Sequence, residues 1–469
     1  MKKNFSLNNL PRITNWLIII IIIIYNVHEK GWDKDNRILA SDVMGYYLYL
    51  PAVVIHKDAT LEFISKNPEK FLNKIWFLKS STGKKVIQFT AGMSILYSPF
   101  FLMAHVSAPW FGYIADGYTP PYKIALLISC LFYFALGLYF LRKILIKYFS
   151  AIVTSITLLS LAIGTHLLYY ATYEAPMSHA YSFSLIIIFL YLLIGWLENP
   201  GYGKTILLGL VTGMIILIRP TNIIVIFLFF LWGIVSWKSF VQRIGFLLRY
   251  YKQILLMILA FFIVWIPQFF YWKVISGSYL YFSYGDRAWF FFNDPQVINV
   301  LFSYRKGWLL YTPIMIFSLI GIPFLLKKLK RSFLPILIIL LLNIYIISSW
   351  WDWWYGGSFG LRAFIDSYGI LAIPFAAFTD WVISRKLFLK ILFLTLFALL
   401  LFFNLFQIAQ YRHGAIHFAS MTKQAYWETF GKLKPTNAFY EKLEYPDYKG
   451  VEERIKKLRE ERNIRRESQ

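Results

Sequence analysis

Residues 16–25 read WLIIIIIIIY, and this run of large apolar side chains decides the class of fold. Lys2, Lys3 and Arg12 precede the run, and no small-residue cleavage site follows it closely. A basic start and an unbroken apolar run without such a site are typical of an uncleaved signal anchor. We therefore expect a first membrane span over residues 13–27, with the N-terminus in the cytoplasm.

The composition of the whole chain points the same way. Of 469 residues, 58% are hydrophobic, 20% are aromatic and only 15% are charged, and the mean hydropathy is +0.55. Because long apolar runs recur from end to end, the sequence predicts an all-α polytopic membrane protein with about eleven transmembrane helices. The predicted spans are 13–27, 122–141, 152–171, 179–197, 205–218, 221–237, 253–272, 308–326, 333–349, 367–384 and 390–409.

Short basic loops indicate which ends of the spans share a face. These loops are Arg142-Lys143 with Lys147, 238–252, 327–331 and 385–390. All four can be cytoplasmic if the proline-interrupted segment 94–114 lies on or re-enters the outer face. In the alternative arrangement, 94–114 crosses the bilayer and 205–237 forms one kinked helix. Arg219 then lies in the hydrocarbon, where a charged side chain is energetically unfavourable. We prefer the first arrangement, and both put the C-terminus outside.

The net charge of +24 comes from lysines and arginines scattered between the spans. Nucleic acid is therefore not an expected partner, since its binding needs basic residues massed on one surface. Cytoplasmic loops and attraction to anionic lipid head groups account for this charge. Cys130 is the sole cysteine, so an intrachain disulfide is excluded.

The polar segment 28–93 is too long for a turn and is expected to form the first outer loop. Residues 41–51 within it read SDVMGYYLYLP. An acid followed by tyrosines just outside a bilayer suits a site where a polar group meets a lipid. Asp42 is the candidate general base, and Tyr46 and Tyr47 are candidate substrate contacts. The simpler alternative is that Asp42 is a solvated loop acid.

Other residues of this loop suggest further roles. Apolar residues near helical spacing in 60–90, with lysines between them, predict amphipathic helices on the membrane. Lys84 and Lys85 are candidates to hold a phosphate leaving group, although head-group attraction explains such lysines as well. Asp33 and Asp35 are weak candidates for binding a divalent cation, which is the one cofactor we consider.

Charged residues near the later span boundaries complete the candidate site. Arg219 and Arg362 carry a planar fork that suits phosphate. Glu174 and His179 flank a span and are candidate substrate contacts, although a single histidine is more often structural. Metal-ligand spacing such as HExxH is absent from the sequence.

Residues 350–355 read WWDWWY, the densest aromatic cluster in the chain. Interfacial anchoring explains such clusters in many membrane proteins. The functional hypothesis is that Trp353 and Tyr355 stack on a sugar while Asp352 bonds its hydroxyl groups. The glycines that follow would let the backbone approach a ligand.

Four motifs together resemble the GT-C class of membrane glycosyltransferases, and more narrowly the bacterial relatives of the protein O-mannosyltransferase and aminoarabinose transferase families. Besides Asp42 in the first outer loop, they are YSPFF at 97–101, GLVTG at 209–213 leading to IRPT at 218–221, and YGGSFGLR at 355–362. The likeness covers roughly residues 10–410. It implies a polyprenyl-phosphate sugar donor, an inverting displacement, and the role of base for Asp42.

The resulting expectation is a GT-C-like transmembrane domain over 1–410 and a polar extension over 411–469 on the outer face. The resemblance implies a bacterial inner-membrane enzyme that is active on the periplasmic face. Its expected acceptor is a glycan, a lipid or a protein, and membrane lipids are expected to surround it. Two alternatives are a polymerase or ligase of surface polysaccharide, and a lipid or solute transporter. The near absence of charge at the span centres argues against transport.

Overall fold

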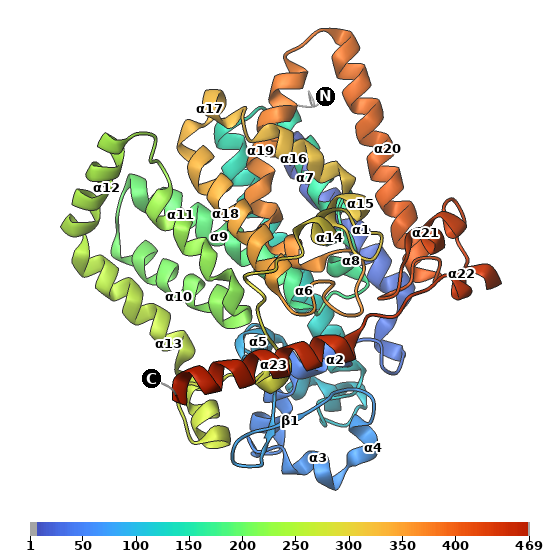
Figure 1. Ribbon diagram of the computed structural model, residues 1–469. Helices are drawn as coiled ribbons and strands as arrows, with labels where there is room; N and C mark the ends of the chain where they lie inside the picture. Colours follow the sequence, from blue (N-terminus) through green and yellow to red (C-terminus); the bar gives the residue numbers. More distant parts are fainter. Residues whose placement is uncertain (1–6, 468–469) are drawn as a thin grey trace.

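The computed structural model describes residues 7–467 as a largely helical protein (Figure 1). Within these residues the one sheet is an antiparallel hairpin of β1 (Leu78–Lys79) and β2 (Lys85–Val86). The predicted all-α class is confirmed. Six helices in the described part are long and apolar enough to cross a membrane. They are α1 (Leu10–Glu29), α6 (Pro120–Tyr148), α9 (Ser178–Glu198), α13 (Tyr251–Ser276), α18 (Lys330–Ser349) and α20 (Leu387–Arg412).

Shorter helices, with η marking 3-10 or π turns, fill the rest of the chain. Up to α13 they are η1 (Leu7–Asn9), η2 (Gly31–Asp33), α2 (Ser41–Tyr47), η3 (Pro51–Ile55), α3 (Glu62–Lys66), α4 (Pro68–Phe71), α5 (Gly92–Ser107), η4 (Ala108–Phe111), α7 (Ala151–Ile163), α8 (Leu167–Thr172), α10 (Tyr202–Ile218), η5 (Pro220–Val225), α11 (Ile226–Leu231) and α12 (Trp237–Arg249). After α13 they are η6 (Gly285–Arg287), α14 (Val297–Phe302), α15 (Trp308–Tyr311), η7 (Pro313–Met315), α16 (Ile316–Gly321), α17 (Leu325–Lys328), η8 (Arg362–Ser367), α19 (Tyr368–Ile383), α21 (Lys423–Thr429), α22 (Asn437–Glu441) and α23 (Tyr448–Glu467).

Some predicted spans are not continuous helices. The span predicted at 308–326 is divided among α15, η7, α16 and α17, with breaks beside Pro313 and Pro323, where proline removes a backbone donor. The span predicted at 152–171 is divided between α7 and α8 by Gly164. The count of eleven crossings therefore stays a prediction.

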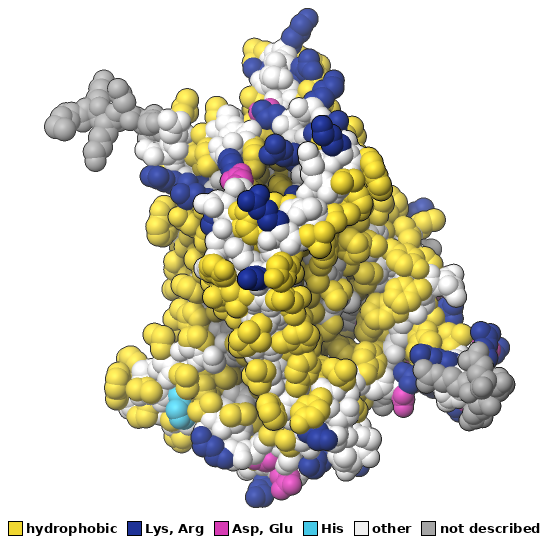
Figure 2. Space-filling model, turned by 90° about the vertical axis from the view of Figure 1, so that its left-hand side faces the viewer, with side chains coloured by type: hydrophobic (Ala, Val, Ile, Leu, Met, Phe, Trp, Pro, Cys, Tyr) yellow, Lys and Arg dark blue, Asp and Glu magenta, His cyan; other side chains and the backbone are white. Residues whose placement is uncertain are grey.

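The basic loops meet at one end of the molecule. The Lys147 amine lies 2.5 Å from the Glu198 carboxylate, which joins the ends of α6 and α9. The Lys328 amine lies 2.8 Å from Asp380 and 5.6 Å from the ring centre of Phe149. Lysine and arginine side chains gather at the upper end of Figure 2, above a belt of apolar surface, and α12 and α17 lie at the same end in Figure 1. These loops therefore lie at one end of the molecule, and the side of the membrane that this end faces stays a prediction.

The segment 94–114 starts and finishes at the opposite end. The Ser94 hydroxyl, near the start of α5, donates to the Tyr46 carbonyl. The Gly117 carbonyl, after η4, accepts from the Tyr47 hydroxyl. Because both flanks contact neighbouring residues of α2, the segment returns to the end it came from, as the preferred arrangement requires.

Helices α10 and α13 pack closely through the GLVTG motif. A Cβ atom on Gly213 would lie 2.9 Å from the Phe261 carbonyl oxygen, and one on Gly209 would come closer still to Met257. Small residues four apart allow helix backbones this close in a membrane. The packing fixes the far end of α10, where Arg219 takes an extended conformation (φ −146°, ψ 106°) and ends the helix.

The first outer loop differs in part from the prediction. Amphipathic helices were expected throughout 60–90, but helical structure there is limited to the short α3 and α4. Residues 78–86 form the β1–β2 hairpin, whose turn includes Gly83 at φ +80°. A left-handed glycine favours a tight turn over continued helix.

The C-terminal extension packs against loops at the end opposite the basic loops. The Lys306 amine donates to the carbonyls of Ser358 and Phe418 and so joins the extension to the loop before η8. Helix α23 lies in the polar extension predicted over 411–469, and most of it is exposed. However, its Ile455 is buried and its Arg454 lies 2.9 Å from Asp294. The extension is therefore part of the structure at the end opposite the basic loops.

Candidate functional site

A cavity of about 480 Å³ opens at the end opposite the basic loops. Its walls come from α2, the start of α9, the break after α10, helix α13 and two loops around 281–290 and 350–355. Seven of the residues predicted from the sequence line it, namely Asp42, Tyr46, His179, Arg219, Asp352, Tyr355 and Arg362. Residues far apart in the chain therefore converge on one site.

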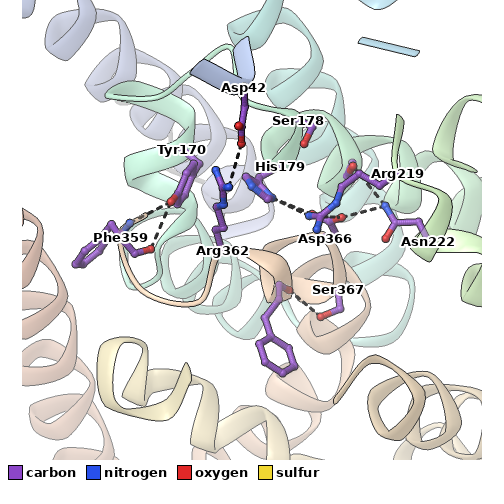
Figure 3. A network of polar contacts seen from close by, with 12 residues as sticks. Asp42, Tyr170, Ser178, His179, Arg219, Asn222, Phe359, Arg362, Asp366 and Ser367 are labelled. Carbon is purple, nitrogen blue, oxygen red and sulfur yellow. Dashed lines mark hydrogen bonds and ion pairs between the residues drawn. The ribbon is translucent and has the colours of Figure 1, made fainter. Parts of the chain in front are cut away.

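Asp42 and Arg362 form an ion pair in the cavity wall (Figure 3). The Asp42 Oδ2 atom lies 3.0 Å from the Arg362 Nη2 atom, and the two side chains are 30% and 15% exposed. Burial lowers the pKa of the Arg362 guanidinium, but the nearby charge of Asp42 and other acidic groups raises it by more. Arg362 is therefore a fixed cation beside the carboxylate.

Arg219 belongs to a separate network centred on Asp366 (Figure 3). The Arg219 Nη1 atom donates to Asp366 Oδ2 at 3.1 Å, and Asn222 Nδ2 donates to the same oxygen at 2.9 Å. His179 Nδ1 lies 3.3 Å from Asp366 Oδ1. The Asp366 side chain is only 5% exposed, so its carboxylate is largely removed from water. Its three partners offset the free-energy cost of that desolvation. The network fixes Arg219 at the cavity wall.

Asp352 and Tyr355 form another part of the wall. The Asp352 Oδ1 atom is buried and has no hydrogen-bond partner among the described residues. Burial raises the pKa of Asp352 to about 6, against the opposing effects of the Gly356 backbone and Arg362. Tyr355 has φ +57°, which is rare for an aromatic residue. Strain of this kind collects at functional sites.

Glu174 lies behind the wall rather than in it. Its carboxylate accepts a hydrogen bond from the Tyr169 hydroxyl at 3.2 Å. Burial raises the pKa of Glu174, while the positive charges of Arg362 and Arg37 oppose that rise. Glu174 therefore adds negative charge near Arg362 without lining the cavity.

The remaining predicted residues do not line the cavity. The Lys84 amine donates to the Val274 carbonyl at 3.0 Å, and the Lys85 amine lies 2.5 Å from the Ser65 hydroxyl. Tyr47 is buried against Gly117, and Trp353 packs with Trp354 at a ring distance of 5.5 Å. These contacts are structural, so phosphate or sugar binding by these residues stays a prediction.

The metal hypothesis also finds no assembled site. Asp33 and Asp35 are exposed and lie outside the cavity lining. Within residues 7–467, no group of three or more His, Cys, Asp and Glu side chains is placed to hold a metal ion. The divalent cation therefore stays a prediction.

Sequence reasoning missed two kinds of residue in this site. Asp366 was given no role, because a carboxylate before a span does not reveal its partners. Trp265 and Trp272 on α13 line the cavity, and their indole N–H groups are buried without a partner in the described structure. Their spacing of seven residues puts them on one helix face, and this was the available signal.

The assembled groups define what the site can do. Arg219 and Arg362 offer positive charge and planar donors, Asp42 and Asp352 offer carboxylates, and tryptophans face the same space. Such a set can hold an anionic group beside a hydroxyl that must lose a proton. No protein-family model and no curated protein matches this chain. The proposal of a function therefore depends on the site and on the motifs.

Proposed function

We propose that this protein is a GT-C-type glycosyltransferase that moves a sugar from a polyprenyl-phosphate donor to a hydroxyl acceptor. The observation that carries the proposal is the convergence of Asp42, Arg219 and Arg362 on one cavity at the end away from the basic loops. A carboxylate and two guanidinium groups are what an inverting transfer from a lipid phosphate requires.

The reaction divides the charged groups by role. Asp42 takes the proton of the acceptor hydroxyl as the acceptor oxygen forms a bond to the anomeric carbon from the side opposite the leaving group. The bond between that carbon and the phosphate oxygen breaks, and its electron pair leaves with the polyprenyl phosphate. Arg219 and Arg362 stabilise the charge that develops there. Asp352 and Tyr355 contact the hydroxyl groups and ring of the sugar.

The depth of the cavity supports a lipid-linked donor. Trp265 lines it and lies eleven residues before the end of α13 at Ser276, which is about 16 Å along a helix. The neighbouring Phe262 and Ile266 are 49% and 47% exposed on a helix apolar enough to span a membrane. A polyprenyl chain could therefore run along this face of α13 while its phosphate meets the arginines.

The distribution of charge supports the orientation. Positive residues favour the cytoplasmic side, so the end that carries α12 and α17 is assigned to the cytoplasm. The cavity then faces the periplasm of a bacterial inner membrane, and about eleven crossings satisfy this arrangement. A glycan, lipid or protein at that surface would supply the acceptor hydroxyl.

The test is a transfer assay with the full chain in liposomes. Polyprenyl-phosphate-linked hexoses and pentoses are supplied singly with an extract of cell-envelope acceptors, and release of polyprenyl phosphate is followed by mass spectrometry. We expect acceptor-dependent release with at least one donor, and its loss in the Arg219→Ala variant. Arg454→Ala is the matched control, because it removes an arginine whose exposed ion pair with Asp294 lies outside the cavity.

Two results would overturn the proposal. In the first, the donor lipids stay intact with every sugar tested, and the envelope glycolipids and glycoproteins do not change when cells lack the protein. The other is movement of lipid or ions across the liposome membrane without transfer, which would favour the transporter alternative.

A further inference from the structure

We propose that Asp42 occupies the phosphate site of Arg362 in the ligand-free protein, so that binding of the donor phosphate frees Asp42 to act as base. The inference rests on the proposed function and adds a rule to it, namely that the donor binds before the acceptor can react. The pair of Asp42 and Arg362 is called the resting pair below.

The pairing of Arg362 with Asp42 leaves part of the Arg362 guanidinium open to a ligand. Within residues 7–467, the polar partner of its guanidinium is Asp42 alone, at 3.0 Å from one Nη atom. A guanidinium has five N–H donors, so the others are available to a ligand oxygen. Because Arg362 and Asp42 both line the cavity, a phosphate entering it meets a cation whose counter-ion is a single carboxylate.

Arg219, by contrast, has a carboxylate partner that is held in place by several groups. Its partner Asp366 accepts from Asn222 as well and lies beside His179, and its side chain is 5% exposed. Removing Asp366 from Arg219 would leave a buried charge unpaired, which is strongly unfavourable. The Asp42 side chain is 30% exposed and is held by one cation, so it can move into solvated space. The resting pair is therefore the exchangeable one.

The residues around the resting pair also favour its exchange for a phosphate. Asp42 is the second residue of the seven-residue helix α2, and the preceding Ser41 has φ +50°, a strained value for a residue with a side chain. Glu174 does not take the place of Asp42, because it lies behind the wall and bonds Tyr169. A phosphate that replaces Asp42 therefore meets the Arg362 guanidinium directly.

The consequence for catalysis is an order of binding. In the resting pair the Asp42 carboxylate is bound by Arg362 and is therefore not free to take the proton of the acceptor hydroxyl. When the donor phosphate takes Arg362, Asp42 is released next to the anomeric carbon at the moment a base is needed. An acceptor that arrives first finds the base occupied, so transfer requires the donor to bind first.

The test measures binding of undecaprenyl phosphate, a donor analogue without sugar, to the full chain in nanodiscs at pH 7.5 through quenching of tryptophan fluorescence. If Asp42 competes with phosphate, Asp42→Asn binds the analogue about fivefold more tightly, and this gain disappears in the Arg362→Ala background. Asp352→Asn is the control for general charge, because Asp352 lines the cavity outside the resting pair. Any tightening that it causes should be equal in both backgrounds.

The outcomes separate the two proposals. Saturable binding by the wild type with no gain in Asp42→Asn, or with an equal gain when Arg362 is absent, overturns the resting pair and leaves the transferase standing. Absence of saturable binding by the folded wild type overturns both. Size-exclusion profiles and thermal midpoints of every variant are recorded first, so that a misfolded variant is replaced by Asp42→Ser before binding is compared.

Discussion

The Arg219 guanidinium lies 3.1 Å from the Asp366 carboxylate and so joins the break after α10 to η8, which precedes α19. This contact links positions 147 residues apart in the chain. Asn222 on η5 donates to the same carboxylate at 2.9 Å. This buried charge network lies beside the pair of Asp42 and Arg362, whose carboxylate is more exposed than that of Asp366 (Figure 3).

The Asp366→Asn variant should lose stability, because it leaves the buried Arg219 without its counter-ion. Breaking a buried ion pair on one side typically costs about 3–5 kcal/mol. We expect the thermal midpoint of the purified protein to fall by several degrees and donor binding to weaken.

Asp380→Asn is the matched control for this variant, since it removes the same charge from a pair with Lys328 whose side chains are 28% and 40% exposed. Exposed pairs contribute about 0–1 kcal/mol. Equal midpoints for the two variants would contradict a stabilising role for the Asp366 network.

Much of this site was predictable from local sequence. Asp42 stood out because tyrosines follow it after an apolar span, and Arg219 because proline follows it between apolar runs. In both cases a charged residue lies beside a stretch of apolar or aromatic residues. The joining of Arg362 to Asp42 was not predictable, because a pairing over such a separation depends on how the helices pack.

The Asp42→Asn variant should transfer sugar at least about a hundredfold more slowly while it still inserts and folds. A positioned base contributes about 10²–10⁴-fold, and an amide cannot take the proton. Turnover is measured in the liposome assay at saturating donor, so that tighter donor binding does not hide the defect. Glu62→Gln is the control, because Glu62 is an exposed acid of the same loop outside the cavity. Transfer at the wild-type rate by Asp42→Asn would remove Asp42 from the mechanism.

The stability of the protein should depend on pH through Asp352. Burial raises its pKa to about 6, so between its unfolded value near 4 and pH 6 the folded state binds more protons than the unfolded state. Stability should therefore fall as pH rises through that window. We expect Asp352→Asn to melt at the wild-type temperature near pH 4 and a few degrees higher at pH 7.5. Parallel melting curves across this range would contradict the burial of an uncompensated carboxylate.

The Gly209→Leu variant should separate α10 from α13, because a side chain at this position meets the Met257 backbone. We expect a large fall in the thermal midpoint and loss of donor binding, since α10 positions Arg219. Gly203→Leu is the matched control in the first turn of the same helix, where an added Cβ meets no atom within 4 Å. Equal stability of the two variants would show that the close approach of these helices is not needed.

The short pieces of helix mark the limit of sequence reasoning about the fold. Hydropathy located the apolar segments because each must be buried in lipid or protein. It could not place breaks such as the one beside Pro313, because a partner helix decides whether a proline bends a span or divides it. The same limit applied to 94–114, whose path is decided by Ser94 and Gly117 meeting α2.

Labelling with a membrane-impermeant maleimide should place the basic end in the cytoplasm. Cys130 is buried and gives a low background in the wild type. We expect Lys79→Cys, in the exposed first strand of the outer hairpin, to react in intact spheroplasts, and Lys147→Cys to react only after lysis. The Lys147 amine contacts an exposed carboxylate, so its replacement should cost little stability. Reaction of both residues from outside would mean that 94–114 crosses the bilayer. In that case Glu198, which contacts Lys147, would have to be outside as well, and the single basic end seen in the structure could not face one compartment.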